Sequence, residues 1–119
     1  MRLRCSLQKD DLVYAGHMLD LARESIELVR AKTRDDFDLD RTLSLALTHL
    51  LQTIGEAARH TSPEFRARHS DIPWAAIVGL RHRVVHDYMH VDLDIVWDVA
   101  NRDLAPLAAQ LEQFVPGET

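Results

Sequence analysis

An arginine and a histidine stand five residues apart in the stretch GLRHRVVHDY, which runs from Gly79 to Tyr88. The planar guanidinium of Arg81 carries a permanent positive charge and matches the oxygens of a phosphate group. A histidine has an ordinary pKa of ~6.5, so the imidazole of His86 is suited to accept and return a proton near neutral pH. Cleavage of RNA by its own 2′-hydroxyl needs a proton acceptor, a proton donor and a cation that faces the developing phosphorane charge. Arg81 and His86 are residues of these types, and the reaction they indicate needs no metal ion.

The spacing by itself has low specificity, because an arginine followed five residues later by a histidine occurs by chance in many proteins. The segment does gather positive charge, and its basic side chains are Arg81, His82, Arg83 and His86. An exposed basic end of a surface helix would have the same composition without binding any ligand. The spacing alone leaves both interpretations open.

The composition is that of a single globular domain. The chain has 119 residues, of which 46% are hydrophobic and 28% are charged, and this length leaves little room for a second core. We expect one helical domain over residues 1–119, with an ordered bundle over about 7–114 and a tail over 115–119. The formal net charge of -5 argues against a protein that coats nucleic acid generally, because such binding needs a basic surface.

Nothing in the sequence predicts export or membrane insertion. No apolar run approaches the ~18 residues of a membrane span. The N-terminal segment MRLRCSLQKDD has no apolar stretch typical of a secretory signal. The single cysteine, Cys5, has no partner within the chain for a disulfide, which fits a reducing compartment. The sequence therefore predicts a cytoplasmic protein that does not contact membranes.

Two long amphipathic helices are predicted from apolar residues spaced three and four apart. The first is expected to end near Lys32, before a polar connection TRDDFD, and the second to start near residues 39–40. The apolar stripe of the first helix consists of Leu12, Ala15, Leu19, Ala22, Ile26 and Val29. That of the second consists of Leu43, Leu47, Leu50, Ile54 and Ala57.

The remaining elements are marked by capping residues and prolines. Ser62 as an N-cap and Pro63 at the first helical position predict a short helix. A longer helix is expected over 73–88, and Asp92 is expected to cap the last helix. Pro106 should interrupt that last helix about one turn before its own position. We see no alternation typical of strands, so we predict an all-α antiparallel bundle of four long helices and a short one.

The predicted helix over 73–88 has a second apolar face beside the one that points to the core. The residues on this face are Val78, His82, Val85 and Met89. A helix packed only within its own bundle does not need such a face, so we expect it to form the interface of a symmetric homodimer. Arg81 and His86 flank the face on opposite sides, because residues five apart do not share one side of a helix. A compact site then needs the length of Arg81, an irregular last turn, or a second copy across the two-fold axis, and the dimer satisfies the geometry best.

Four linked segments together resemble the HepT-type HEPN proteins, the DUF86 group. The segments are TIGEAARH (53–60), SPEF (62–65), DIPWAAIVGLRHRVVHDY (71–88) and VDLDIVWDVANRDLAPL (91–107). They occur in the family's order and with its spacing, and the similarity is continuous from about Leu43 to Leu111. Several linked motifs are far more specific than a single pair of residues.

The resemblance implies a HEPN-fold ribonuclease toxin of a type VII-like bacterial or archaeal toxin–antitoxin module. Arg81 and His86 correspond to the family's catalytic motif, in a metal-independent endoribonuclease without a cofactor. The implied partners are a second copy of the chain, an RNA substrate and a minimal nucleotidyltransferase, the antitoxin. This antitoxin is expected to neutralise the toxin by AMPylation of Tyr88. The alternative is a non-catalytic accessory subunit that presents a substrate to a nucleotidyltransferase. A plain dimeric structural module is a third reading, which the intact catalytic pair disfavours.

Two positions depart from the usual pattern of that family. The residue after the motif arginine is often Asn, and here it is His82, to which we assign an assisting role. Many relatives have an aromatic residue after the motif tyrosine, and here it is Met89. The first departure concerns the chemistry and the second the interface.

Several other side chains have competing interpretations. His82, His86 and His90 are spaced four apart and would form a ladder of metal ligands if the helix continued. The segment HVD, however, indicates a helix break that moves His90 away. Glu56 and His60 are interpreted as a solvated or interhelical polar contact. Trp74 and Trp97 are expected in the core or an interface, while Arg66, Arg68 and His69 fit either an exposed short helix or a basic rim for RNA.

Overall fold

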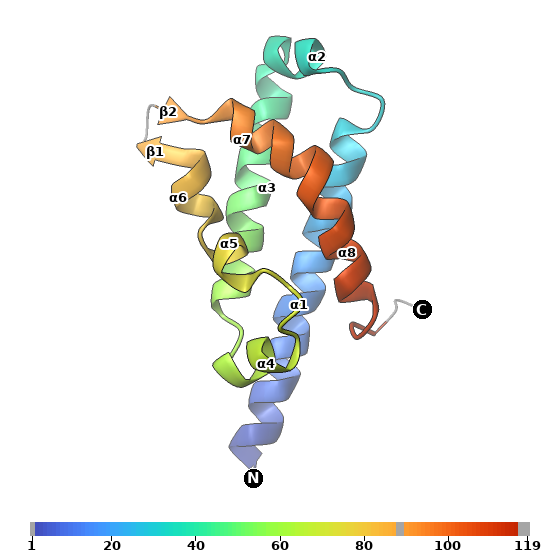
Figure 1. Cartoon of the computed structure of the whole chain (residues 1–119), viewed down its shortest axis with the longest axis vertical. Helices are drawn as coiled ribbons and strands as arrows, with labels where there is room; N and C mark the ends of the chain where they lie inside the picture. Colours follow the sequence, from blue (N-terminus) through green and yellow to red (C-terminus); the bar gives the residue numbers. More distant parts are fainter. Residues whose placement is uncertain (1, 88–89, 117–119) are drawn as a thin grey trace.

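The computed structural model describes residues 2–87 and 90–116, and these residues form a mainly helical bundle (Figure 1). Two long helices, α1 (Arg2–Val29) and α3 (Arg41–Arg59), pack against each other in antiparallel directions. An interrupted helix at the C-terminal end packs on both of them. It consists of α7 (Leu93–Asp98), the π-helical turn η1 (Val99–Asp103) and α8 (Leu104–Glu112). The all-α class predicted from the sequence is confirmed.

Shorter elements connect these helices. In chain order they are α2 (Arg34–Leu39), α4 (Pro63–Arg68), α5 (Trp74–Val78), α6 (Leu80–Val84), β1 (Val85–Asp87) and β2 (His90–Val91). Figure 1 shows α5, α6 and the two strands on one side of α3, opposite to α1. Within the described residues, no helix combines the length and the hydropathy that a membrane span requires.

The sequence predicts one long helix over 73–88, and this prediction is wrong beyond the first turns. The helix is divided at Gly79 into α5 and α6, and α6 ends at Val84. The carbonyl of Val84 accepts a hydrogen bond of 2.7 Å from the backbone N–H of Asp92. The donor lies outside the helix, so the carbonyl of Val84 is already hydrogen-bonded where α6 ends. Val85 is extended, with φ -119 and ψ 107, a conformation that suits a β-branched side chain.

The expected absence of strands is also wrong. β1 and β2 pair antiparallel, with Val85 opposite Val91 and Asp87 opposite His90, and the register shifts between these two pairs. Strands of this length carry too few alternating residues to give a recognisable pattern in the sequence. The third long helix of the predicted bundle, over 73–88, is therefore replaced by two short helices and a small hairpin.

The predicted helix starts are confirmed at three positions. Asp40, Ser62 and Asp92 each accept a hydrogen bond from the backbone N–H three residues later, which is the N-cap arrangement. The segment TRDDFD is not a plain polar connection, because it contains α2. Thr33 and Asp36 form a reciprocal capping box at the start of that helix.

The predicted interruption of the last helix is confirmed and takes the form of a π-helical turn. The N–H of Leu104 donates to the carbonyl of Val99, five residues earlier, instead of the usual four. Pro106 follows within the first turn of α8. A proline has no N–H for the carbonyl four residues before it, and its ring crowds that carbonyl. The wider turn relieves this conflict.

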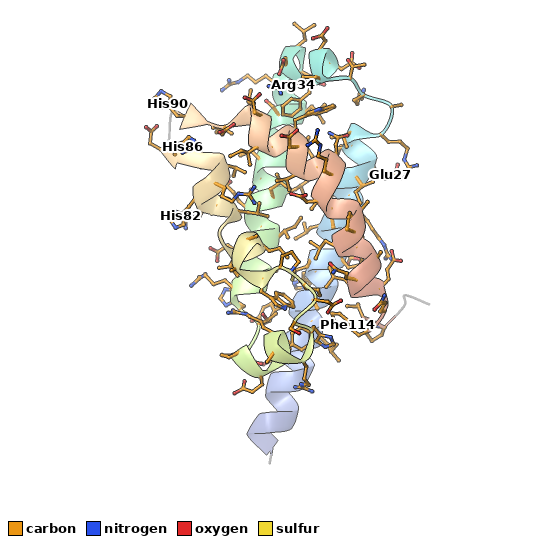
Figure 2. The ribbon with its side chains drawn as sticks, in the orientation of Figure 1. Glu27, Arg34, His82, His86, His90 and Phe114 are labelled. Carbon is orange, nitrogen blue, oxygen red and sulfur yellow. The ribbon has the colours of Figure 1, made fainter. Side chains whose placement is uncertain are left out.

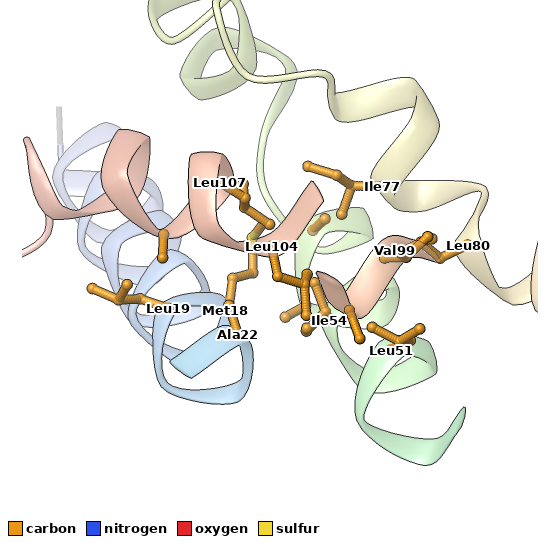
Figure 3. Packing of buried hydrophobic residues seen from close by; sticks show 14 of the residues in the cluster. Met18, Leu19, Ala22, Leu51, Ile54, Ile77, Leu80, Val99, Leu104 and Leu107 are labelled. Carbon is orange, nitrogen blue, oxygen red and sulfur yellow. The ribbon is translucent and has the colours of Figure 1, made fainter. Parts of the chain in front are cut away.

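The core lies between α1, α3 and the C-terminal helix (Figure 3). Met18 from α1, Ile54 from α3 and Leu104 from α8 are almost completely buried, with exposed fractions of 0%, 0% and 1%. Ile77 and Leu80 add a layer from α5 and α6. The side chains that will form the candidate site are therefore attached to short elements, whose inner faces are fixed in this core.

Gly55 lets α3 and α5 approach each other closely. A Cβ atom at this position would lie 2.9 Å from the carbonyl oxygen of Ile77 and 3.7 Å from the Cβ of Leu80. Real Cβ atoms essentially never come within 3.0 Å of another heavy atom in this way. Because the obstacle is backbone rather than a flexible side chain, any other residue would force α3 and α5 apart.

We expect Gly55→Ala to destabilise the protein by about 1–3 kcal/mol, the usual cost of overpacking a tight core. Gly16→Ala is the matched control, since its Cβ would meet only Val115 Cγ1 at 3.9 Å. Alanine favours the interior of α1, so this control should gain about 0.5–1 kcal/mol. Urea unfolding of the three proteins measures both effects. Equal stability of Gly55→Ala and the unsubstituted protein would contradict the close approach.

Candidate functional site

Arg81 and His82 line an open groove of about 810 Å³ between α3 and the corner formed by α5 and α6. Both residues lie on α6 and are exposed. The opposite wall comes from the C-terminal half of α3, with Glu56 and Arg59. The indole of Trp74 and the side chain of Val78 add apolar surface to the groove.

The charges in the groove are largely compensated, with Arg81 as the exception. Glu56 accepts a hydrogen bond of 3.0 Å from Arg59. This bond holds the pKa of Glu56 below its ordinary value, and the charges of Arg59, His60 and Arg81 lower that pKa further. Arg66 donates to the carbonyls that end α3. Within the described chain, no hydrogen bond or ion pair occupies the guanidinium of Arg81.

His86 lies on β1, on the same edge of the molecule as His82 and His90 (Figure 2). Its side chain is 59% exposed, and its Nε2 atom lies 3.6 Å from Oδ2 of Asp92. His86 is not among the residues that line the groove of Arg81. A single chain therefore presents the phosphate-binding type of side chain and the proton-transferring type on neighbouring elements rather than in one pocket.

The three histidines do not form the ladder that a continuing helix would have produced. His82 lies on α6, His86 on β1 and His90 on β2, so no helix aligns their rings. The imidazole Nδ1 of His90 instead lies 2.9 Å and 3.0 Å from the two carboxylate oxygens of Asp87. The break that the segment HVD indicates is present, and it begins earlier than expected.

The predicted dimer face is not a stripe on one helix. Val78 lies on α5, His82 on α6 and Val85 on β1, because the helix ends at Val84. Met89, the last residue of the predicted face, lies outside the described residues, as does Tyr88. Of the three routes considered for a compact site, an irregular end of the helix is present in the structure, but it does not place Arg81 and His86 in one pocket.

The comparison with protein families assigns the chain. The model of the family described as "Ribonuclease HepT-like" matches residues 18–114. This range contains the groove, the hairpin and every residue of the predicted site. The chain belongs to the HepT-like ribonuclease family.

Curated relatives of this family cover most of the chain. "Putative RNase TTE0752" of Caldanaerobacter subterraneus is 32% identical over 105 residues, which are 88% of this chain and 94% of that protein. "Probable ribonuclease HepT" of Thermococcus cleftensis is 31% identical over 105 residues, or 85% of this chain and 94% of that protein. "Gamma-glutamylcyclotransferase and putative RNase MJ0434" of Methanocaldococcus jannaschii is 33% identical, and the similarity spans only 47% of it. No solved structure matches the chain significantly.

Other side chains of this HepT-like chain have structural roles that agree with or refine the sequence interpretation. The indole of Trp74 is buried and donates to the carbonyl of His69 at 2.9 Å, as expected for a core aromatic. Arg66 stabilises the end of α3 rather than forming a free basic rim. Glu56 lies 3.9 Å from His60, an exposed pair as predicted, although its principal partner is Arg59.

The carboxylate beside His86 is the residue that sequence reasoning missed in this role. Asp92 was identified only as the N-cap of the last helix, a function that it does have. Its second contact depends on the hairpin, which brings two residues six positions apart together. The pairing of Arg59 with Glu56 was equally invisible, although a separation of three residues on a helix allows it.

Proposed function

We propose that this HepT-like protein is an endoribonuclease in which Arg81 and His86 carry out the reaction. The observation that supports the proposal best is the arrangement at the edge shared by α6 and β1. An arginine without a partner in the described chain lines a groove there, and the strand that follows its helix carries an exposed histidine that faces a carboxylate. The relatives named as ribonucleases support the same activity.

In the proposed reaction the 2′-oxygen of a ribose forms a bond to the adjacent phosphorus, and the bond from phosphorus to the 5′-oxygen breaks. The products are a 2′,3′-cyclic phosphate and a free 5′-hydroxyl. A base takes the proton of the 2′-hydroxyl, and an acid gives a proton to the leaving 5′-oxygen. Arg81 faces the negative charge that grows on the phosphorane oxygens. These groups satisfy the reaction without a metal ion.

A homodimer supplies both proton carriers that the reaction needs, one that accepts a proton and one that donates it. One chain contains one Arg81 and one His86, whereas two chains around a two-fold axis contribute two of each to a common cleft. One imidazole then takes the proton of the 2′-hydroxyl while the other gives a proton to the 5′-oxygen. We place the dimer interface on Val78, His82, Val85 and Met89. His82, at the edge of the groove, is assigned an assisting role in holding the phosphate.

Cleavage of total RNA in the presence of EDTA tests the catalytic pair. We expect Arg81→Ala and His86→Ala to slow cleavage by ~10²-fold or more, because they remove the cation and the proton carrier. Arg83→Ala and His90→Ala are matched controls, since these exposed residues belong to the same helix and hairpin and should leave the rate unchanged. Loss of cleavage in EDTA, or full cleavage by His86→Ala, would reject the mechanism.

The dimer is tested by sedimentation velocity. Val85→Glu places a charge on the half-buried β1 position of the proposed interface and should shift the protein toward monomer. Leu39→Glu is the control, because Leu39 is 88% exposed on α2, away from the hairpin. Circular dichroism verifies that both variants are folded. A Val85→Glu protein that remains dimeric would place the interface elsewhere.

We further propose that the protein is the toxin of a toxin–antitoxin pair, controlled by AMPylation of Tyr88. Tyr88 stands two residues after His86 in the sequence. An AMP group on its phenol would bring a bulky anion to the segment that carries the catalytic pair. Such an anion competes with RNA for Arg81, so it blocks cleavage while the protein stays folded. The reaction joins the phenol oxygen to the α-phosphorus of ATP and releases pyrophosphate.

Coexpression with a minimal nucleotidyltransferase, the proposed antitoxin, followed by intact-mass measurement, tests this control. We expect a mass increase of one or more AMP units that is absent in Tyr88→Phe. The chain has two tyrosines, so Tyr14→Phe is the matched control and should be modified like the unsubstituted protein. Equal modification of Tyr88→Phe would remove Tyr88 from the proposal. AMPylation of a protein that never cleaves RNA would favour the accessory subunit instead.

A further inference from the structure

Asp92 makes contacts with three neighbouring elements at once. Its Oδ1 atom accepts a hydrogen bond of 3.1 Å from the backbone N–H of Ile95, which caps α7. Its Oδ2 atom lies 3.6 Å from Nε2 of His86 on β1. Its backbone N–H donates to the carbonyl of Val84, the last residue of α6. One carboxylate oxygen therefore serves as the helix cap, and the other faces the imidazole of His86.

We propose that Asp92 is a positioning residue that holds the imidazole of His86 in one orientation and one tautomer. With the carboxylate facing Nε2, the neutral ring carries its proton on Nε2. Nδ1 is then the nitrogen that accepts the proton of the 2′-hydroxyl or returns one to the 5′-oxygen. This inference deepens the proposed ribonuclease function and rests on it for the role of Nδ1.

The carboxylate of Asp92 is well suited to hold another group, because its own position is fixed. It is bound at the start of α7, where the partial positive charge of the helix N-terminus also favours an anion. Its side chain is 30% exposed, compared with 59% for the imidazole that it faces. A separation of 3.6 Å is an ion-pair distance that exceeds a hydrogen bond. Catalytic contacts of this type often shorten only when substrate is bound.

The other carboxylate on the hairpin has a different partner. Asp87 holds the Nδ1 atom of His90 at 2.9 Å, so the two acid–histidine pairs on the hairpin are separate. Asp94, two residues after Asp92, forms an ion pair of 2.7 Å with Arg34 of α2. Asp92 is therefore the acidic residue that the structure pairs with His86.

The carboxylate also affects the charge that appears during the reaction. When Nδ1 accepts the proton of the 2′-hydroxyl, the ring becomes an imidazolium with N–H groups on both nitrogens. The negative charge of Asp92 then faces the positive ring at Nε2. No proton needs to pass to Asp92, because its part is to orient the ring and to stabilise the charged form, as an aspartate does in a serine-protease triad.

The test compares Asp92→Ser with Asp94→Ser. Serine caps helices about as well as aspartate, so Asp92→Ser keeps the start of α7 and removes the carboxylate from His86. Asp94→Ser removes the same charge from the same helical turn without touching the imidazole. Thermal unfolding verifies that both variants are folded. The ring nitrogens of ¹⁵N-labelled histidine then report the tautomer, and His86→Gln identifies the signals of His86.

At a pH where the rings are neutral, His86 should carry its proton on Nε2 more completely than His49, an exposed histidine on α3. This difference should vanish in Asp92→Ser and persist in Asp94→Ser. In the cleavage assay, Asp92→Ser should lose on the order of 10- to 100-fold in kcat, as for loss of the partners that orient metal-bound histidines, with KM nearly unchanged.

Identical tautomer ratios for His86 and His49 in the unsubstituted protein would overturn the inference, even if Asp92→Ser failed to fold. An unchanged ratio for His86 in a folded Asp92→Ser protein would do the same. The nuclear magnetic resonance measurement does not depend on RNA. A protein that shows the tautomer effect and no cleavage would reject the ribonuclease proposal and leave the orienting contact in place.

Discussion

The backbone contact at Gly55 is the constraint on which the rest of the structure depends. α3 approaches α5 so closely that the carbonyl oxygen of Ile77 would lie 2.9 Å from any Cβ at position 55. This approach lets Ile77 and Leu80 reach the core from elements of only five residues each. Isolated helices of that length have no stability of their own. Their order, and with it the placement of Arg81, is supplied by α3.

The second constraint is the hydrogen bond from Asp92 to Val84, which acts on the other side of α6. It ends the helix and starts the hairpin, so the chain leaves the helical path before His86. The same residue then faces His86 with one carboxylate oxygen and caps α7 with the other. Asp92 thus links the end of α6 through its backbone N–H, and the histidine and the start of the C-terminal helix through its side chain.

Structural features set by residues close together in the sequence could be predicted, and those set by residues far apart in the sequence could not. The caps at Ser62 and Asp92 involve an N–H only three residues away, so residue type and position were sufficient to predict them. The capping box of α2 has an equally local signal, in Thr33 and Asp36, which was overlooked. The end of α6 is different, because its cause is a donor eight residues further along the chain. A helical period extends through Val84 and Val85 regardless of that donor.

The same distinction applies to the candidate site. The chemical types of Arg81 and His86 and their connection with phosphate chemistry follow from the sequence alone. The contacts of each side chain do not follow from the sequence, because the contacting residues lie on other elements or other helical turns. Glu56 lines the same groove as Arg81 but forms its hydrogen bond with Arg59, a pairing that the sequence did not reveal. Asp92 likewise reaches His86 only through the hairpin.

The separation of Arg81 and His86 has a mechanical consequence. Arg81 is fixed through the core contacts of α6, whereas His86 is fixed through the hairpin and Asp92. The relative position of the two groups therefore depends on the geometry at Val84 and Val85, where helix changes to strand. A continuous helix would have placed them on opposite sides of one cylinder, at 100° for each residue. The break removes that restriction, so the distance between cation and imidazole is no longer set by helical geometry.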